Sequence, residues 1–259
     1  MKRQESKFLL PLDILSSYLS ELSKQYSLLA INKDYMFLYN STYFDTSDMK
    51  FYNMHHNGAY SRYKVRVRHY LSTGARYLEV KKKDNKGVCT KSRRSLIAQT
   101  AIHSLDEWIS NVCPVELSLL QPSINIQYQR MTLMSMVDKE RVTIDLNVSF
   151  GSLRNFKSHQ LTNNVIVEVK REKNTKDSLA YQLLRKRGFR EVSLSKYCIG
   201  SGLTQTGNIK INRFKRILNR IKSMKHERVS GETRSDMDLN RDFSTEDNQE
   251  MLSTIYQGR

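Results

Sequence analysis

The residues best suited to chemistry in this sequence are cations that alternate with apolar side chains. Between residues 62 and 68 the even positions are cationic and the odd positions are apolar, in the run Arg62-Tyr63-Lys64-Val65-Arg66-Val67-Arg68. A period of two is typical of a strand with one apolar and one polar face. We therefore expect a cationic strand face that meets an anion. Arg66 and Arg68 are its strongest candidates, while Arg62 and Lys64 would guide the substrate at the entrance.

Carboxylates join the cations in further segments that alternate in the same way. Glu79, Asp145 and Glu168 fall at polar positions of three such segments. A single charged strand face is usually just solvated, but repetition in successive strands favours a shared ionic surface. An antiparallel sheet of this kind can curl so that helices cover its apolar face while its ionic face lines a tunnel.

The composition indicates an anionic partner. The chain has 259 residues and a formal net charge of +17, which favours nucleic acid, an anionic membrane or polyphosphate. Removing cations from water is costly unless counter-charges are close. The carboxylates offset only part of the positive charge. A bound polyanion with Mg²⁺ or Mn²⁺, which prefer hard oxygen ligands, would complete the balance.

The elements that must hold these faces follow from apolar spacing, turns and caps. We expect strands at 2–10, 35–44, 61–71, 75–83, 88–96, 123–134, 139–148 and 164–171. We expect helices at 12–25, after the capping run Asp45-Thr46-Ser47-Asp48 as far as Gly58, at 104–112 with Ser104 as cap, and at 175–187 before Gly188. Ser72-Thr73-Gly74 predicts a hairpin turn.

The chain divides by composition into three parts. We expect a folded domain at 1–205, a basic amphipathic helix at 206–228 and a disordered, net acidic tail at 229–259. Residues 208–228 would lie on an anionic membrane, on a membrane protein or against the domain itself. No stretch is long and apolar enough to cross a bilayer.

The three cysteines form no CxxC or Cys/His pair, which argues against a zinc site or a disulfide framework. We expect a cytoplasmic protein, peripheral to the inner face of the membrane if the helix binds there.

An ordered set of short motifs over residues 3–200 resembles a known family. The motifs are Glu5-Ser6-Lys7-Phe8, Tyr43-Phe44-Asp45-Thr46, Tyr63-Lys64-Val65-Arg66-Val67-Arg68, Leu78-Glu79-Val80-Lys81, Lys91-Ser92-Arg93, Tyr128-Gln129-Arg130, Arg141-Val142-Thr143-Ile144-Asp145, Val167-Glu168-Val169-Lys170 and Ser195-Lys196-Tyr197. Each motif alone is weak, but their order is specific. The set resembles the VTC-type polyphosphate polymerase domain of the triphosphate tunnel metalloenzymes, which include the CYTH proteins.

The resemblance implies an α+β fold, an antiparallel eight-stranded β-barrel tunnel with flanking helices. It implies transfer of the terminal phosphoryl group of ATP to a growing polyphosphate chain, with Mn²⁺ or Mg²⁺ as cofactor and ADP as product. The implied phosphate ligands are Lys7, Arg66, Arg68, Lys81, Lys91, Arg130 and Arg141. Tyr128 and Ser195 would add hydrogen bonds, Lys196, Arg93 and Glu5 would contact the substrate, and Glu168 would hold the metal.

Two positions depart from the family pattern. Hydrolytic tunnel enzymes begin with an ExExK motif, and Arg3 stands here in place of its first glutamate. A hydrolase is therefore less expected than a polymerase. Ser193 stands where some relatives carry a tunnel lysine. Lys196 is a possible replacement, although strand alternation would point it to the opposite face.

Two other functions stay open. One is a metal-dependent hydrolase of tripolyphosphate or nucleoside triphosphates, which would release orthophosphate without chain growth. The other is a non-catalytic module that binds polyanions. Binding of single-stranded nucleic acid favours aromatic side chains among the cations for base stacking. Tyr63 falls instead on the apolar side of its expected strand, so we expect no specific nucleic-acid partner.

Overall fold

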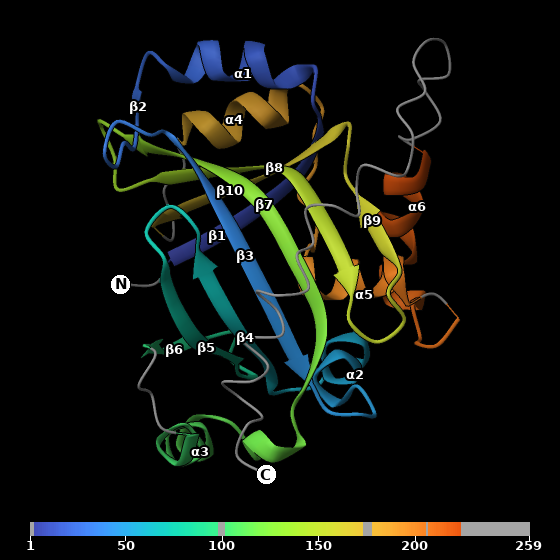
Figure 1. Cartoon of the computed structure of the whole chain (residues 1–259). Coiled ribbons are helices and arrows are strands. Elements are labelled where there is room, and N and C mark those ends of the chain that lie inside the picture. The colour runs from blue at the N-terminus through green and yellow to red at the C-terminus, as the bar shows by residue number, and fades with distance from the viewer. Residues whose placement is uncertain (1–2, 98–101, 173–177, 206, 224–259) are drawn as a thin grey trace.

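A strongly curved antiparallel sheet organises the computed structural model, which describes residues 3–97, 102–172, 178–205 and 207–223 (Figure 1). The strands are β1 (Arg3–Pro11), β2 (Tyr26–Leu28), β3 (Met36–Asp45), β4 (Arg62–Tyr70), β5 (Ala75–Lys83), β6 (Cys89–Leu96), β7 (Gln121–Ser135), β8 (Arg141–Ser152), β9 (Ser158–Gln160) and β10 (Asn164–Glu172). The helices are α1 (Ile14–Leu22), α2 (Lys50–Asn57), α3 (Ile102–Val112), α4 (Leu179–Lys186), α5 (Lys196–Thr204) and α6 (Lys215–Ser223), with short 3₁₀ helices η1 (Leu117–Leu119) and η2 (Asn212–Phe214).

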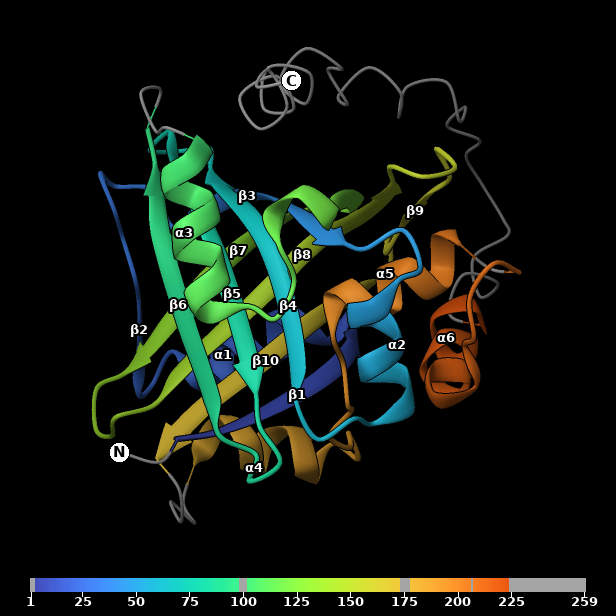
Figure 2. The ribbon, with the colours of Figure 1, turned by 90° about the horizontal axis from the view of Figure 1, so that it is seen from below.

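The sheet confirms the expected antiparallel fold with flanking helices. Its main path runs β1-β10-β8-β7-β3-β4-β5-β6, while β2 pairs with β7 and β9 pairs with β8. Seen from below, β4, β5 and β6 cross in front of β1 and β10 (Figure 2). Within the described residues no ladder joins β1 to β6. The expected barrel is therefore a curled sheet that hydrogen bonds do not close.

Alternate residues of each strand point to the outer side of the sheet. The residues at these positions are mostly apolar. Along β10, Val165, Val167 and Val169 pack with residues of α1 and α4. Along β4, Val65 and Val67 pack with residues of α3. Each fully buried aliphatic side chain contributes roughly 1.5–3 kcal/mol. These two clusters attach helices to opposite parts of the curled sheet (Figure 1).

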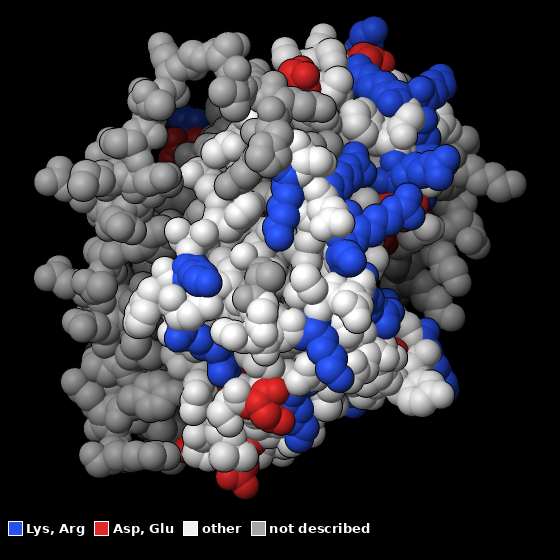
Figure 3. Space-filling model, turned by 90° about the vertical axis from the view of Figure 1, so that its right-hand side faces the viewer, with Lys and Arg blue, Asp and Glu red and all other residues white. Residues whose placement is uncertain are grey.

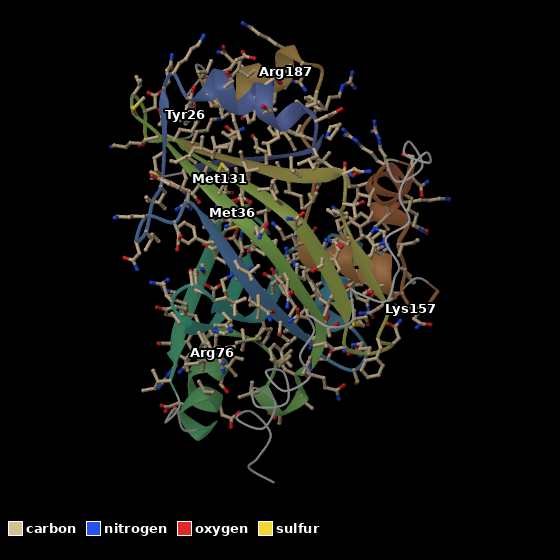
Figure 4. All side chains as sticks on the ribbon, turned by 45° about the horizontal axis from the view of Figure 1, so that its top comes forward. Tyr26, Met36, Arg76, Met131, Lys157 and Arg187 are labelled. Carbon is tan, nitrogen blue, oxygen red and sulfur yellow. The ribbon has the colours of Figure 1, made fainter. Side chains whose placement is uncertain are left out.

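The contact between α1 and α4 is extended by a charged side chain at the end of α4. The guanidinium of Arg187 pairs with Glu21 and lies 5.9 Å from the centre of the Tyr18 ring (Figure 4). Tyr18 is buried and donates a hydrogen bond to the Ala180 carbonyl at 3.1 Å. The two helices therefore form one layer above the sheet.

The inner face changes from ionic to apolar along its length. Asn147 has a positive φ of 51°, and the pairing of β7 with β8 shifts register at this level. Because this bulge changes the alternation, Val148 and Phe150 join an inner apolar cluster beyond the charged Asp145. Helix α5 packs on that cluster, so it covers the apolar end of the inner face.

Asp45, at the end of β3, fixes two helices at once. Its carboxylate accepts the backbone N–H groups of Thr46, Phe51 and Tyr52 at 2.8, 2.8 and 2.9 Å. The hydroxyl of Tyr197 in α5 donates to the same carboxylate. The predicted capping run before α2 is thus confirmed, and the same carboxylate also positions α5.

The basic segment after residue 205 packs on the domain. Within the described residues the expected helix is shorter than predicted and consists of η2 and α6. Leu218 and Ile221 of α6 are buried in the cluster that contains α5. The cations of this segment are mostly exposed on a face of the molecule rich in lysine and arginine (Figure 3). No helix in the described ranges is both long and apolar enough to span a membrane. The predicted tail at 229–259 lies outside the described residues, and the domain boundaries stay a prediction.

Most expected strands and helices are present within a few residues. Three local expectations were wrong or incomplete. Ser104 lies inside α3 and is not its cap. The Ser195-Lys196-Tyr197 segment is the start of helix α5, not a strand. Short strands β2 and β9 were not anticipated, because three residues are too few to show alternation.

Gly200 provides a test of how tightly α5 must pack. A Cβ atom there would lie 2.4 Å from Cδ1 of Phe150 and 2.7 Å from Cδ1 of Ile124. We expect Gly200→Ala to lower the free energy of unfolding by roughly 1–3 kcal/mol, because overpacking displaces the helix. The matched variant Gly202→Ala, whose nearest contact would be 3.0 Å from Leu218, should change it by less than about 1 kcal/mol. Urea unfolding measures both, and equal stabilities would contradict this packing.

Candidate functional site

The cationic face predicted on β4 lies on the inner side of the sheet. Tyr63, Val65 and Val67 are buried in the outer cluster below α3, which leaves Arg66 and Arg68 on the opposite face. We call the charged inner side the ionic face; it comprises Glu5, Lys7, Lys64, Arg66, Arg68, Glu79, Lys81, Lys91, Arg93, Arg130, Arg141, Asp145, Glu168, Lys170 and Lys196. The alternation in the sequence therefore correctly predicted which face of β4 carries the arginines.

Arg66 is held by a buried carboxylate. Its Nε and Nη2 lie 2.7 and 2.6 Å from Oε2 of Glu79, and its Nη1 donates to the Tyr43 hydroxyl at 2.7 Å. Lys91 pairs with the other carboxylate oxygen. Burial raises the pKa of Glu79, but Arg66, Arg68 and Lys91 outweigh burial and lower it to about 2. Glu79 is therefore negatively charged at neutral pH and orients two of the predicted phosphate ligands.

Arg130 is held in the same way by Asp145. Its Nε and Nη2 donate to the two carboxylate oxygens at 2.6 and 2.9 Å. Lys196, the first residue of α5, pairs with the same carboxylate, which is fully buried. Burial raises the pKa of Asp145, but Lys196 and Arg130 reverse that effect and lower it. Asp145 thus joins β7, β8 and α5 at one point.

Two stacked tyrosines lie against the arginines of β4 and β7. The rings of Tyr39 and Tyr128 are parallel, with centres 5.3 Å apart. The guanidinium of Arg68 lies 5.4 Å from the Tyr39 ring, and that of Arg130 lies 5.2 Å from the Tyr128 ring. Arg68 also donates to Ser41 at 3.3 Å and to the Tyr128 hydroxyl at 3.0 Å. Neutral groups therefore fix Arg68, whereas a carboxylate fixes Arg130.

The β1 and β10 side of the ionic face holds two neighbouring carboxylates. Lys7 lies 2.8 Å from Glu5 and 3.5 Å from Glu168, and Lys170 also pairs with Glu168. Burial raises the pKa of Glu168, but the positive charges of Lys7 and Lys170 lower it well below its usual range. Carboxylate oxygens are suitable ligands for Mg²⁺ or Mn²⁺, which are usually bound by one or two carboxylates together with substrate phosphates. Glu168 and Glu5 fit that donor set.

Of the remaining predicted site residues, two are exposed, one caps a helix and one lies near Glu5. Arg93 is exposed with its guanidinium 4.8 Å from the Tyr77 ring, and Arg141 is exposed at the start of β8. The hydroxyl of Ser195 caps α5 by accepting the Cys198 N–H at 3.4 Å. Lys81 on β5 contributes to the lowered pKa of Glu5 on β1. Lys81 and Glu5 therefore lie near enough for their charges to interact across the curled sheet.

The structure also adds residues that the sequence analysis missed. Tyr39, Ser41 and Tyr43 of β3 contact the arginines, and their period-two spacing was the available signal. Burial raises the pKa of Tyr43, but Arg66, Arg68 and Lys64 lower it to about 8. The expectation that Lys196 points away was wrong, because a helix begins at this residue and directs it to Asp145.

The comparisons with known proteins agree with this architecture. The model of the VTC domain matches residues 2–204. No curated protein sequence matches the chain significantly. A crystal structure of a candidate adenylate cyclase from Bacillus halodurans is similar, with 14% identity and a TM-score of 0.50, covering 83% of this chain and 99% of that one. A candidate adenylyl cyclase from Hippeastrum, whose structure is described with a dominant triphosphatase activity, has 16% identity and a TM-score of 0.50, covering 81% of this chain and 98% of that one. These likenesses show the shared fold.

The low pKa of Glu79 gives a pH-dependent test of the ionic face. A carboxylate whose pKa falls from 4.5 to about 2 on folding stabilises the protein above pH 4.5, and this stabilisation is lost as the pH falls toward 2. Gln resembles the protonated form, so Glu79→Gln should lower the free energy of unfolding by about 3 kcal/mol at neutral pH. The difference from the unaltered protein should shrink over that acidic range.

Urea unfolding over a pH series measures this difference. The control is Glu107→Gln, at an exposed position of α3, for which we expect little change at any pH. A deficit in Glu79→Gln that stays constant between pH 4.5 and about 2 would contradict the ionised, charge-paired state of Glu79.

Proposed function

The chain belongs to the VTC domain family, and from this premise we propose that it is a metal-dependent polyphosphate polymerase that uses ATP. The proposed reaction transfers the terminal phosphoryl group of ATP to the end of an inorganic polyphosphate chain. The family and the fold shared with a described triphosphatase support a role in handling triphosphate or polyphosphate. One observation carries the finer proposal: a single sheet gathers oriented arginines and lysines from distant strands onto one ionic face.

Arg68 and Arg130 are suited to phosphate because only part of each guanidinium is engaged. Arg68 uses Nε and Nη2 with neutral partners, and Arg130 uses Nε and Nη2 with Asp145. Among the described residues, Nη1 of both side chains has no protein acceptor, and each Nη1 carries two N–H donors. These donors would bind phosphate oxygens, while Lys7, Lys81 and Lys91 would act as point charges.

Phosphoryl transfer requires little covalent chemistry from the protein. The catalyst must align the attacking and leaving oxygens and neutralise the charge spread over the transferred group. Donors that are already oriented need no reorganisation as the reaction proceeds, and they act strongly where water is excluded. In our proposal Arg66, Arg68 and Arg130 align the triphosphate, and Lys196 approaches from the α5 side.

The proposed metal site consists of Glu168 with Glu5. A bound Mg²⁺ or Mn²⁺ would neutralise negative charge on the phosphate oxygens. Both carboxylates pair with lysines, and a bound metal ion would take over from these lysines as the counter-charge. Arg3 takes the place of a further glutamate in β1. The donor set therefore has one carboxylate fewer than the ExExK motif of the hydrolytic tunnel enzymes provides. This difference favours polymerase activity over the hydrolase alternative.

The reaction products distinguish the candidate functions. With ATP and Mn²⁺ we expect ADP and phosphate chains that lengthen with time, resolved by gel electrophoresis. Arg68→Ala should lower kcat/KM by roughly 100-fold or more, the usual cost of removing one oriented donor. Because Arg68 pairs with no carboxylate in the described residues, this variant should fold. Arg190→Ala, at an exposed position, is the control and should be fully active.

Orthophosphate release without chains would instead establish the hydrolase. Absence of turnover with any divalent metal or phosphate primer, together with retained polyphosphate binding, would establish the non-catalytic module. Either result would contradict the polymerase proposal.

Glu168 gives a separate test of the metal site. We expect Glu168→Gln to raise the Mn²⁺ concentration needed for half-maximal activity by at least about 10-fold, since even outer-sphere partners of a metal contribute that much. Calorimetric titration of Mn²⁺ with tripolyphosphate present should show the same weakening. Glu191→Gln, on the exposed surface, is the control. An unchanged metal titration would rule Glu168 out as a ligand.

A further inference from the structure

Lys64 and Lys81 differ from the other lysines on the ionic face, which pair with carboxylates. The paired groups are Glu79 with Arg66 and Lys91, Asp145 with Arg130 and Lys196, and Glu168 with Lys7 and Lys170. Within the described residues no carboxylate lies within 4.0 Å of the Lys64 amine. Lys64 was expected at the entrance, yet it is half-buried on the strand that carries the central arginines.

The neighbours of Lys64 increase its electrostatic cost. The strand register places Lys64 directly opposite Lys81 on β5, and Lys81 directly opposite Lys91 on β6. Like charges at opposed positions of an antiparallel pair destabilise the sheet. Burial lowers the pKa of Lys64, Cys198 and Tyr43 oppose this effect, and the charges of Lys7 on β1 and Lys81 act in the same direction as burial. Without an anion, this part of the ionic face is therefore repulsive.

Along one face of β4, Lys64 comes before Arg66, and Arg68 follows Arg66. Lys64 and Arg68 are four residues apart on one face, which corresponds to about 13 Å along a strand. A single phosphate ion is too small to contact both side chains. A linear chain of phosphates is long enough, and each of its units carries negative charge.

We propose that Lys64, together with Lys81 and Lys7, binds a phosphate unit of a linear polyphosphate beyond the units held by the arginines, and so favours longer chains. This inference rests on the proposed function, because it extends the same substrate site. The anion would relieve the repulsion among the three lysines. Lys64 would therefore weaken the unliganded fold and strengthen the complex.

The substitution Lys64→Met tests both effects, because it keeps a long side chain and removes the charge. Calorimetry should show affinity for a long linear polyphosphate lowered by roughly 10-fold or more, as expected for loss of a charged hydrogen bond. The loss for tripolyphosphate should be smaller, since a short chain can bind at the arginines alone. The melting temperature of the unliganded variant should rise by roughly 1–3 °C, because like-charge repulsion is removed.

The control is Lys82→Met, the neighbouring lysine on the opposite face of β5, where its amine lies 5.7 Å from the Tyr63 ring. It should leave both affinities unchanged. Unchanged polyphosphate affinity in Lys64→Met, equal losses for the two anions, or a lower melting temperature would each overturn the assignment of Lys64. Failure of the unaltered protein to bind either anion would instead contradict the proposed function itself.

Discussion

The neutralisation of buried cations by buried carboxylates is the constraint on which the site depends. A charge removed from water costs several kcal/mol unless a partner with good geometry compensates for it. Asp145 meets this need for Arg130 and Lys196, and Glu79 meets it for Arg66 and Lys91. Each carboxylate joins different elements. The ion pairs that offset the cost of burying these charges therefore also fix the positions of the strands and of α5.

The two faces of the sheet divide stability and binding between them. The outer face buries aliphatic side chains against α1, α3 and α4, which supplies most of the favourable free energy of folding. The inner face gains little net stability from charge pairs, but it holds donors in fixed directions. The change from ionic to apolar at the β8 bulge allows α5 to pack there and to direct Lys196 inward.

Local patterns predicted most of the sheet, and long-range contacts explain what they missed. The alternation from Arg62 to Arg68 identified the inner face of β4, because side-chain direction in a strand follows from position alone. The same rule failed at Lys196, since the chain there is helical and its direction depends on the contact between Tyr197 and Asp45. Sequence alone also gave no sign that Lys64 lacks a carboxylate, because pairing depends on register between strands.

Partial neutralisation explains how such a face can be both stable and ready for an anion. Complete pairing would leave no donor for a phosphate, whereas unpaired cations would repel one another and splay the sheet. Arg68 and Arg130 lie between these limits, because each is oriented by two of its nitrogens and retains the third. Oriented donors with a net positive charge bind a polyanion without reorganising, which is the property that phosphoryl transfer requires of a protein.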